Sequence, residues 1–458
     1  MKLMHKSFID EARIALALRE AVAPSADTLE SLINSVNSLS GLELEEVASL
    51  MAIDDAKVWH NIFKTAGEIK EKVYGRRIVL FAPLYLSNEC ENNCLYCGFR
   101  SSNRLLKRRT LTIDEAVGQA RILAEMGHKR ILLVSAENES DASLDYICDV
   151  VSAIYENTKI RIAHVNVAPF DIGGFRRLKE AGIGVYQLFQ ETYHRDTFAH
   201  MHPSGRKSEY EWRINAMDRA VEAGIEDVGL GALFGLYDWR FEVLALLQHT
   251  RHLEERFGVS AHTISVPRLM PAYGTPIKDA PNPVSDLEFK KIVAILRLAL
   301  PNIGIVISTR ESAGLRNEII SIGASQISAA SRTSPGGYIN SESDEDKSQF
   351  SLDDTRTLDE VVGAICDSGN IPSFCASCYR IGRTGGKFLE LAQHGGIKDF
   401  CDPNVILTLK EYLIDYAGPD TKKKCEAAIK AYLGRDGLDL KVEKKLKRIE
   451  SGERDIYF

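Results

Sequence analysis

Eight short apolar segments recur along the middle of the sequence, and polar or amphipathic stretches separate them. Segments of this length, rich in Val, Ile and Leu, are typical of parallel strands that are buried on both faces. They lie at residues 78–86, 130–136, 160–168, 184–190, 227–233, 262–269, 303–309 and 325–331. Strands that alternate with helices over about 255 residues indicate an α/β fold, and we predict a (β/α)8 TIM-type barrel. A doubly wound open sheet is the alternative.

Helix signals fill the stretches between these segments and extend beyond them at both ends. In TIDEAVGQARILAEMG, for example, Thr112 and Glu115 have the spacing of a capping box. After about residue 335 the sequence becomes polar and acidic, which indicates a surface loop before a new helical section. We therefore expect a helical N-terminal extension, the barrel and a C-terminal unit at residues 1–75, 76–335 and 336–458.

The charge of the chain gives no reason to expect a polyanionic partner. Its 458 residues include 57 Lys plus Arg against 64 Asp plus Glu, a formal net charge of -7. We therefore expect neither nucleic acid nor a membrane surface as a partner. The N-terminus lacks the apolar core of a signal peptide, and no apolar run is long enough to span a bilayer. The predicted location is the cytoplasm, and the predicted partners are small molecules and proteins.

Nine cysteines in such a chain favour metal binding over a disulfide framework. Cys90, Cys94 and Cys97 form the pattern C-x3-C-x2-C directly after the first predicted strand, where a barrel carries its catalytic groups. Three thiolates can hold three irons of a four-iron cluster, and the fourth iron is then open to another ligand. The alternative is a zinc site that takes a distant His as its fourth ligand.

A second group, Cys375, Cys378 and Cys401, has the spacing C-x2-C-x22-C. It predicts a second cluster with an open iron, and a zinc site completed by His394 is the alternative. Five further residues lack a partner at useful spacing and receive a structural interpretation: Cys148, Cys366, Cys425, His194 and His202.

The first cysteine pattern, with an aromatic before its last cysteine and C-G-F at that cysteine, resembles the radical S-adenosylmethionine (radical SAM) superfamily. The resemblance implies that the amino and carboxylate groups of S-adenosylmethionine chelate the open iron. It also implies that the reduced 4Fe–4S cluster cleaves the sulfonium to give a 5'-deoxyadenosyl radical. Tyr96 would flank the adenine, unless its ring only packs the loop.

Longer stretches narrow the resemblance to one family. GRRIVLFAPLYLSN, FQETYHR, AMDRAVEAGIEDVGLG, SRTSPGGY and CYRIGRTG are similar to the tyrosine lyase that matures FeFe-hydrogenase (the HydG family), a relative of 2-iminoacetate synthase. The C-x2-C-x22-C group is the specific part. The family resemblance implies cleavage of the Cα–Cβ bond of L-tyrosine to p-cresol and dehydroglycine. It further implies that a C-terminal cluster, with a fifth, labile iron held by free L-cysteine and a histidine, converts dehydroglycine to carbon monoxide and cyanide.

His262 matches the histidine that the family uses on the labile iron, although a lone His at a strand start is usually structural. Gln190, Glu191 and Arg195 follow the fourth predicted strand, where polar groups could hold the ribose and methionine parts of the cofactor. A salt-bridge pair at the strand end is the alternative there.

Ser331, Arg332 and Thr333 end the eighth predicted strand, where a charged fork could bind a substrate carboxylate. A capped loop with a glycine turn is the alternative. The resemblance also implies two kinds of protein partner, an electron donor such as ferredoxin or flavodoxin and other hydrogenase maturation proteins.

The chain departs from the family pattern at three places. Glu89 replaces an aromatic before the first cysteine. SAENE at 135–139 leaves only Glu137 or Glu139 to bind the cofactor amino group, and Met270 replaces a guanidinium that we expect near the labile-iron end. These changes keep two alternatives open: a paralogous amino-acid lyase, 2-iminoacetate synthase-like or with a changed substrate, that makes no iron product, and an iron–sulfur scaffold or carrier without radical chemistry.

Overall fold

The computed structural model describes residues 7–140, 142–339, 347–393, 397–433 and 440–458. Strand β1 (Arg77–Ser87) pairs in parallel with β2 (Arg130–Ser135) and with β8 (Gln326–Ser328), so the sheet closes on itself. The strands between them are β3 (Ile162–Asn166), β4 (Tyr186–Gln187), β5 (Val228–Gly231), β6 (Thr263–Ser265) and β7 (Gly304–Ile307). The predicted barrel is confirmed, and the open sheet is wrong.

Burial on both faces explains why the strands have no alternating polar pattern. Every residue of β1 except Pro83 is buried, and β5, β6 and β7 are buried throughout. One face of each strand fills the barrel interior, and the other lies under the surrounding helices.

Most helices around the barrel begin at a residue whose side chain caps the first turn. Thr112 Oγ1 accepts from the backbone N–H of Glu115 at 3.2 Å, and Glu115 accepts from the N–H of Thr112 at 2.9 Å, so the predicted capping box is present. These helices are α5 (Ile113–Glu125), α6 (Leu144–Asn157), α7 (Ile172–Glu180), α8 (Arg195–Met201), α9 (Tyr210–Ile214), α10 (Ala216–Glu222), α11 (Trp239–Phe257), α12 (Asp286–Ala299) and α13 (Ala313–Ile322).

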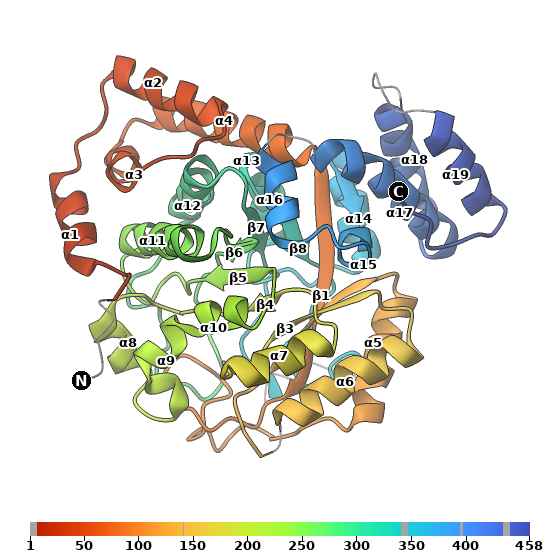
Figure 1. The fold of residues 1–458 in the computed structure, drawn as a ribbon, viewed down its shortest axis with the longest axis horizontal. Coiled ribbons are helices and arrows are strands. Elements are labelled where there is room, and N and C mark those ends of the chain that lie inside the picture. The colour runs from red at the N-terminus through yellow and green to blue at the C-terminus, as the bar shows by residue number, and fades with distance from the viewer. Residues whose placement is uncertain (1–6, 141, 340–346, 394–396, 434–439) are drawn as a thin grey trace.

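Four helices precede the barrel: α1 (Glu11–Glu20), α2 (Ala26–Asn37), α3 (Leu44–Met51) and α4 (Ala56–Tyr74). They run along one side of it in Figure 1, where α4 packs on α12 and α13. Gly67 permits this close approach, because a Cβ at this position would lie 2.3 Å from the carbonyl oxygen of Ser321.

A ninth strand that the sequence did not predict, β9 (Ile371–Ser373), pairs with the first residues of β1. Val79 pairs with Gln326 of β8 and with Ser373 of β9, so β9 lies on the edge of β1 that β2 occupies further along. Pro372 is tolerated because β9 is an edge strand. Two residues after β9 comes Cys375, which is thereby placed at the N-terminal end of the barrel.

The remaining helices are α14 (Leu358–Asp367), α15 (Ser377–Arg380), α16 (Gly385–Gln393), α17 (Ile397–Asp415), α18 (Pro419–Leu433) and α19 (Leu440–Glu450). They gather beside the barrel in Figure 1. Cys366 of α14 and Cys425 of α18 are buried in the contact between these helices, with their sulfurs 3.3 Å apart. Within the described residues, no helix combines the length and the apolar character that crossing a membrane requires.

Candidate functional site

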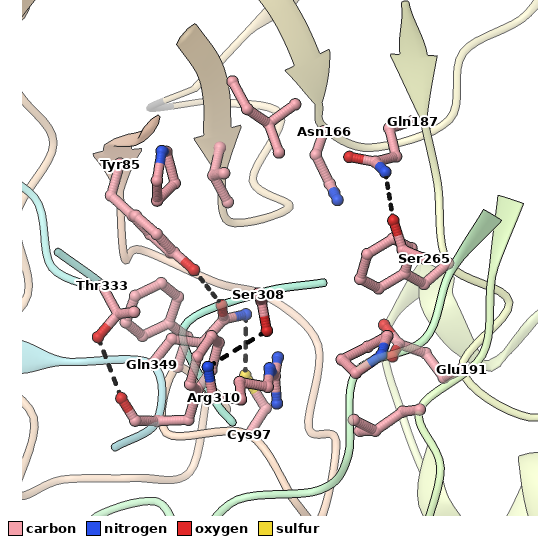
Figure 2. Close-up of a pocket in the computed structure, with 18 of the residues that line it drawn as sticks. Tyr85, Cys97, Asn166, Gln187, Glu191, Ser265, Ser308, Arg310, Thr333 and Gln349 are labelled. Carbon is pink, nitrogen blue, oxygen red and sulfur yellow. Dashed lines mark hydrogen bonds between the residues drawn. The ribbon is translucent and has the colours of Figure 1, made fainter. Parts of the chain in front are cut away.

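A cavity of about 180 Å³, which we call the upper cavity, opens at the C-terminal ends of the barrel strands. Cys90, Cys94 and Cys97 line it. The cysteine loop packs closely on the segment 348–350: a Cβ at Gly98 would lie 2.7 Å from the carbonyl oxygen of Ser348. From the same segment, Gln349 Nε2 donates to the sulfur of Cys97 at 3.7 Å (Figure 2). One loop thus presents all three predicted ligands to one space.

Burial disfavours free thiolates in this loop. It raises the pKa of Cys90 to about 11 and that of Cys94 further. Iron binding supplies the positive charge that a buried thiolate needs. In the part of the chain that the structure describes, no three Cys, His, Asp or Glu side chains converge as they would around a single ion. The fit of a four-iron cluster therefore rests on the shared cavity and on the donor chemistry.

Two partly buried ion pairs lie beside the cysteines. Arg213 donates to Glu137 at 2.9 Å, and Lys207 donates to Glu191 at 2.6 Å. Burial and the charge of Arg213 oppose protonation of Lys207, but Glu191, Cys94 and Glu137 outweigh them and raise its pKa. The wall of the cavity therefore offers ionised groups of both signs, as a zwitterionic ligand requires.

Glu191 is held in an unusual backbone conformation, with a φ of 73°. The segment that follows is fixed by Glu242 of α11, whose carboxyl group accepts from the Thr192 hydroxyl and from the backbone N–H of Tyr193. Glu242 is 0% exposed. Strained residues persist only where their surroundings fix them, so we infer that Glu242 supports the conformation of Glu191.

Glu242 predicts a pH dependence of stability. Burial raises its pKa from the usual value of 4.5 to about 8, although its two hydrogen bonds act in the opposite direction. Between these values the folded chain binds more protons than the unfolded chain, so the free energy of unfolding falls as the pH rises. The expected contribution is about 1.4 kcal/mol for each pH unit in this window.

The measurement is the unfolding free energy of the native chain and of Glu242→Gln between pH 5 and pH 8. The native chain should lose stability relative to the variant as the pH rises. Parallel curves for the two proteins would show that Glu242 is ionised in the folded state.

The structure brings only some of the predicted cofactor ligands into the upper cavity. Tyr96, Glu137 and Glu191 line it. Gln190 is buried outside it, and its Nε2 has no hydrogen-bond partner among the described residues. Arg195 turns away and pairs with Glu211 at 2.7 Å while its guanidinium covers the ring of Tyr210.

The structure also brings only some of the residues predicted to bind the substrate carboxylate into the upper cavity. Ser331 and Thr333 line the upper cavity, whereas Arg332 is exposed and donates to the carbonyl oxygen of Ser331. At this side of the cavity the guanidinium is supplied by Arg310, after β7 (Figure 2), in addition to that of Arg213 beside the cysteines. The Arg310 guanidinium stacks on Phe350 at 3.4 Å from the ring centroid and makes no ion pair with any described residue.

Sequence reasoning missed Arg310, Lys207 and Arg213. Arg310 follows the predicted strand 303–309 directly, so the strand-end argument used for Arg332 applies equally to it. Lys207 lies in a short 3-10 turn before α9, and Arg213 lies within α9. Neither is at a recognisable strand end, and no signal in the sequence singles them out.

The lower cavity opens at the N-terminal ends of the strands, between the barrel and α15–α17. Cys375, Cys378 and Cys401 line it together with His262. Three arginines also line it: Arg77, Arg130 and Arg383. The cavity is thus rich in positive charge, which favours an anionic group such as a thiolate-bound cluster.

Two features of the lower cavity fit a metal group. Cys401 donates a hydrogen bond to Cys378, and this bond, with the charges of Arg77 and Arg383, lowers the pKa of Cys378 to about 7. His262 Nδ1 lies 3.4 Å from Asp227 Oδ1, an arrangement that orients a metal-binding imidazole. His394, the alternative zinc ligand, lies outside the described residues.

Comparison with known proteins places the chain among radical SAM enzymes. The Radical SAM superfamily profile matches residues 84–247, and that of the Biotin and Thiamin Synthesis associated domain matches residues 265–371. The 2-iminoacetate synthase of Escherichia coli (strain K12) is 32% identical over 337 residues, which cover 73% of this chain and 87% of that protein. The hydrogenase maturase subunit HydE of Thermotoga maritima is 30% identical, over 58% of this chain and 72% of HydE.

Solved structures are more specific. A crystal structure of HydG, a maturase of the FeFe-hydrogenase, is 47% identical and superposes with a TM-score of 0.95, covering 99% of this chain and 100% of that one. The chain belongs to the HydG family. A second member, HydG from Carboxydothermus hydrogenoformans, is 39% identical with a TM-score of 0.84, over 96% of this chain and 97% of that one.

Membership of the HydG family makes this chain a radical SAM enzyme of the hydrogenase-maturase type, with a 4Fe–4S cluster and S-adenosylmethionine as cofactors. The structure shows where two of the departures from the HydG pattern lie. Met270 lines the upper cavity and not the lower one, which contains the predicted labile-iron histidine, so its predicted location is wrong. Glu137 also faces the upper cavity, whereas Glu139 pairs with Arg206 at 2.5 Å on the surface. Of the two candidate glutamates, only Glu137 is placed to meet a ligand.

A third, middle cavity of about 20 Å³ lies inside the barrel of this HydG-family chain. It shares four residues with the upper cavity, Phe81, Leu132, Gln187 and Val306. It shares four others with the lower cavity, Arg130, His262, Gln326 and Tyr379. The two cysteine groups therefore face the two ends of one barrel interior.

Proposed function

We propose that this enzyme cleaves the Cα–Cβ bond of L-tyrosine to p-cresol and dehydroglycine and then forms carbon monoxide and cyanide at a second cluster. The proposed cleavage of tyrosine rests on the position of Arg310. Its half-buried guanidinium lies in the upper cavity, where Nη1 donates to the carbonyl oxygen of Arg268 at 3.3 Å but no carboxylate of a described residue pairs with it. An amino-acid carboxylate is the ligand that would complete it.

The walls beside Arg310 fit the rest of tyrosine. Phe81, Leu132 and Val306 form a buried apolar group that faces the cavity and can enclose a phenol ring. Thr333 Oγ1 donates to the carbonyl oxygen of Phe350 at 3.0 Å and holds the residue on which Arg310 stacks. Arg310 therefore keeps its position before the substrate arrives, as an efficient carboxylate site requires.

The other side of the cavity suits the cofactor. When bound, a reduced four-iron cluster on Cys90, Cys94 and Cys97 supplies, with S-adenosylmethionine, the radical that starts the reaction. Glu137 and Glu191 would accept hydrogen bonds from the amino and ribose groups of the cofactor. Arg213 and Lys207 already pair with these two glutamates and hold their carboxylates at the cavity wall.

We assign the second half of the reaction to the lower cavity. Cys375, Cys378 and Cys401 would hold an auxiliary 4Fe–4S cluster, and His262, oriented by Asp227, would bind a labile iron together with free L-cysteine. Dehydroglycine would reach this cavity through the middle cavity. The proposed partners are an electron donor such as ferredoxin or flavodoxin and the other hydrogenase maturation proteins.

The test is an anaerobic assay of reconstituted protein with S-adenosylmethionine, dithionite and L-tyrosine. It follows 5'-deoxyadenosine, p-cresol, cyanide and carbon monoxide together. All four should form, and a Cys375→Ser/Cys378→Ser variant should lose carbon monoxide while it keeps p-cresol. Cys148→Ser is the matched control, because Cys148 lies on α6 outside both cavities, and it should change no product.

The other outcomes identify the alternatives. Deoxyadenosine and p-cresol without carbon monoxide and cyanide would mean a tyrosine lyase that makes no iron product. Deoxyadenosine without p-cresol would mean a changed substrate, for which Met270 in the upper cavity would be the first residue to examine. A protein that forms no deoxyadenosine but transfers its cluster to an apo-acceptor would be a scaffold.

A further inference from the structure

We propose that residues 100–109 form the docking surface for an acidic, ferredoxin-type electron-carrier protein that reduces the upper cluster. The inference rests on the proposed function, because it requires a reducible cluster on the first cysteine group. We call this segment, RSSNRLLKRR, the basic loop. It contains five Arg and Lys and no Asp or Glu, and it follows the cysteine loop directly.

The basic loop forms a thin wall between the cysteines and solvent. Leu106 is 6% exposed and lies on the inner side of the basic loop, where it packs with Tyr85 and Phe99. Cys90 and Cys97 contact the same apolar group. The neighbouring residue, Leu105, is 59% exposed on the outer side. A protein that contacts Leu105 is therefore separated from the cluster ligands by about one layer of side chains.

The charges of the basic loop serve two purposes. Arg108 points inward and donates to the carbonyl oxygens of Asn88, Phe99 and Arg100 at 2.5–2.7 Å, so it holds the loop against the cysteine segment. Arg104 and Lys107 are exposed. Arg109 pairs with Glu115 at 2.5 Å, and Arg100 is half-buried. Arg108 therefore holds the loop rigidly, and the exposed Arg104 and Lys107 make its outer surface positive.

A second loop adds an aromatic residue to this surface. The side chain of Asn103 connects the two loops: its Nδ2 donates to the carbonyl oxygen of Tyr273 at 2.9 Å, and its Oδ1 accepts from the backbone N–H of Leu105 at 3.2 Å. Tyr273 is 48% exposed. Exposed Leu and Tyr side chains among basic residues resemble the centre and rim of a transient protein interface.

An acidic carrier is the partner that this surface fits. The only acidic residues in the preceding cysteine segment are Glu89 and Glu91, so basic residues outnumber acidic ones five to two over residues 89–109. This imbalance is local, because the whole chain has a net charge of -7. A positive patch at the cluster on an otherwise acidic protein would steer an acidic carrier to this place. In the step itself, one electron leaves the carrier and enters the cluster, and no bond forms or breaks.

The experiment compares two reductants on reconstituted enzyme with S-adenosylmethionine. The test variant is Arg104→Glu/Lys107→Glu, and the control is Lys422→Glu/Lys423→Glu on the exposed face of α18, which changes the net charge equally. Stopped-flow absorbance follows cluster reduction by reduced ferredoxin or by dithionite. With ferredoxin at low salt, the test variant should be slower by about tenfold and the control unchanged. With dithionite, all three proteins should be alike.

Salt provides a second criterion, because screening weakens interactions between exposed charges. The difference between native and test proteins should shrink at 0.5 M salt. Two results would overturn the proposal: an unchanged rate with ferredoxin, or equal slowing with both reductants, which would mean damage to the cysteine loop. If the native protein holds no cluster that dithionite reduces, the proposed function fails, and this result is distinct from both.

Discussion

An Arg310→Ala variant should form p-cresol from L-tyrosine about thirtyfold to several thousandfold more slowly than the native enzyme. A charged hydrogen-bonded pair that is truncated on one side costs about 2–5 kcal/mol, and each 1.36 kcal/mol corresponds to a factor of ten. Arg310→Lys should recover only part of the rate, because an ammonium group lacks the two-pronged geometry of guanidinium. The measurements are initial rates of p-cresol and of 5'-deoxyadenosine formation over a range of tyrosine concentrations.

Arg332→Ala is the matched control for this experiment. Arg332 is exposed at the same end of the barrel, so its loss should leave the rate within about twofold, as is usual for surface positions. Cleavage of S-adenosylmethionine without tyrosine should survive in all three variants, since Arg310 is assigned to the substrate. Normal p-cresol formation by Arg310→Ala, with loss in Arg332→Ala, would restore the substrate fork that the sequence predicted.

The second large effect is expected on stability. Asp354→Ala should lower the free energy of unfolding by about 3–5 kcal/mol, because it leaves the guanidinium of Arg316 buried without its partner. Arg316 and Asp354 have side chains that are 0% and 1% exposed, and Arg316 also donates to the carbonyl oxygen of Ser328 in β8. Thermal unfolding of the reconstituted proteins, scanned at one rate, would show the loss as a lower transition temperature.

Asp353→Ala is a suitable comparison, since Asp353 is the exposed neighbour and forms no ion pair with a described residue. Its transition should stay close to that of the native protein. The segment 348–354 also covers the upper cavity, so Asp354→Ala should release this cover and weaken retention of the first cluster. Equal transition temperatures for the two variants would show that the buried pair contributes little.

The barrel could be predicted from the sequence because its signals are local. Eight apolar runs, each about as long as a strand, gave the eight strands of the closed sheet, and Thr112 and Glu115 marked the start of α5. The ninth strand could not be predicted in this way. It has three residues, one of them proline, and it forms only because β1 extends beyond β2 and leaves an edge to pair with.

The site residues show what can and cannot be predicted from the position of a residue at a strand end. Ser331, Arg332 and Thr333 do lie at the level of the upper cavity, but Ala330 has a φ of 52°, and the chain turns there so that Arg332 is exposed. A positive φ at alanine leaves no mark in the sequence, unlike one at glycine. The position of a residue along a strand was therefore predictable, and the direction of its side chain was not.

One strand joins the two cavities that hold the cysteine groups, and this fixes their spacing. β1 begins at Arg77, which lines the lower cavity, and ends at Ser87, three residues before Cys90. Ten residue steps in a strand span about 33 Å. In many enzymes a hinge motion that brings two domains together sets the order of the reaction steps, but a strand inside a closed barrel has no hinge. Under the proposed function, the order of the two half-reactions would then be set by the arrival of the intermediate and not by movement of the protein. A one-residue deletion in β1 would turn every following side chain to the opposite face.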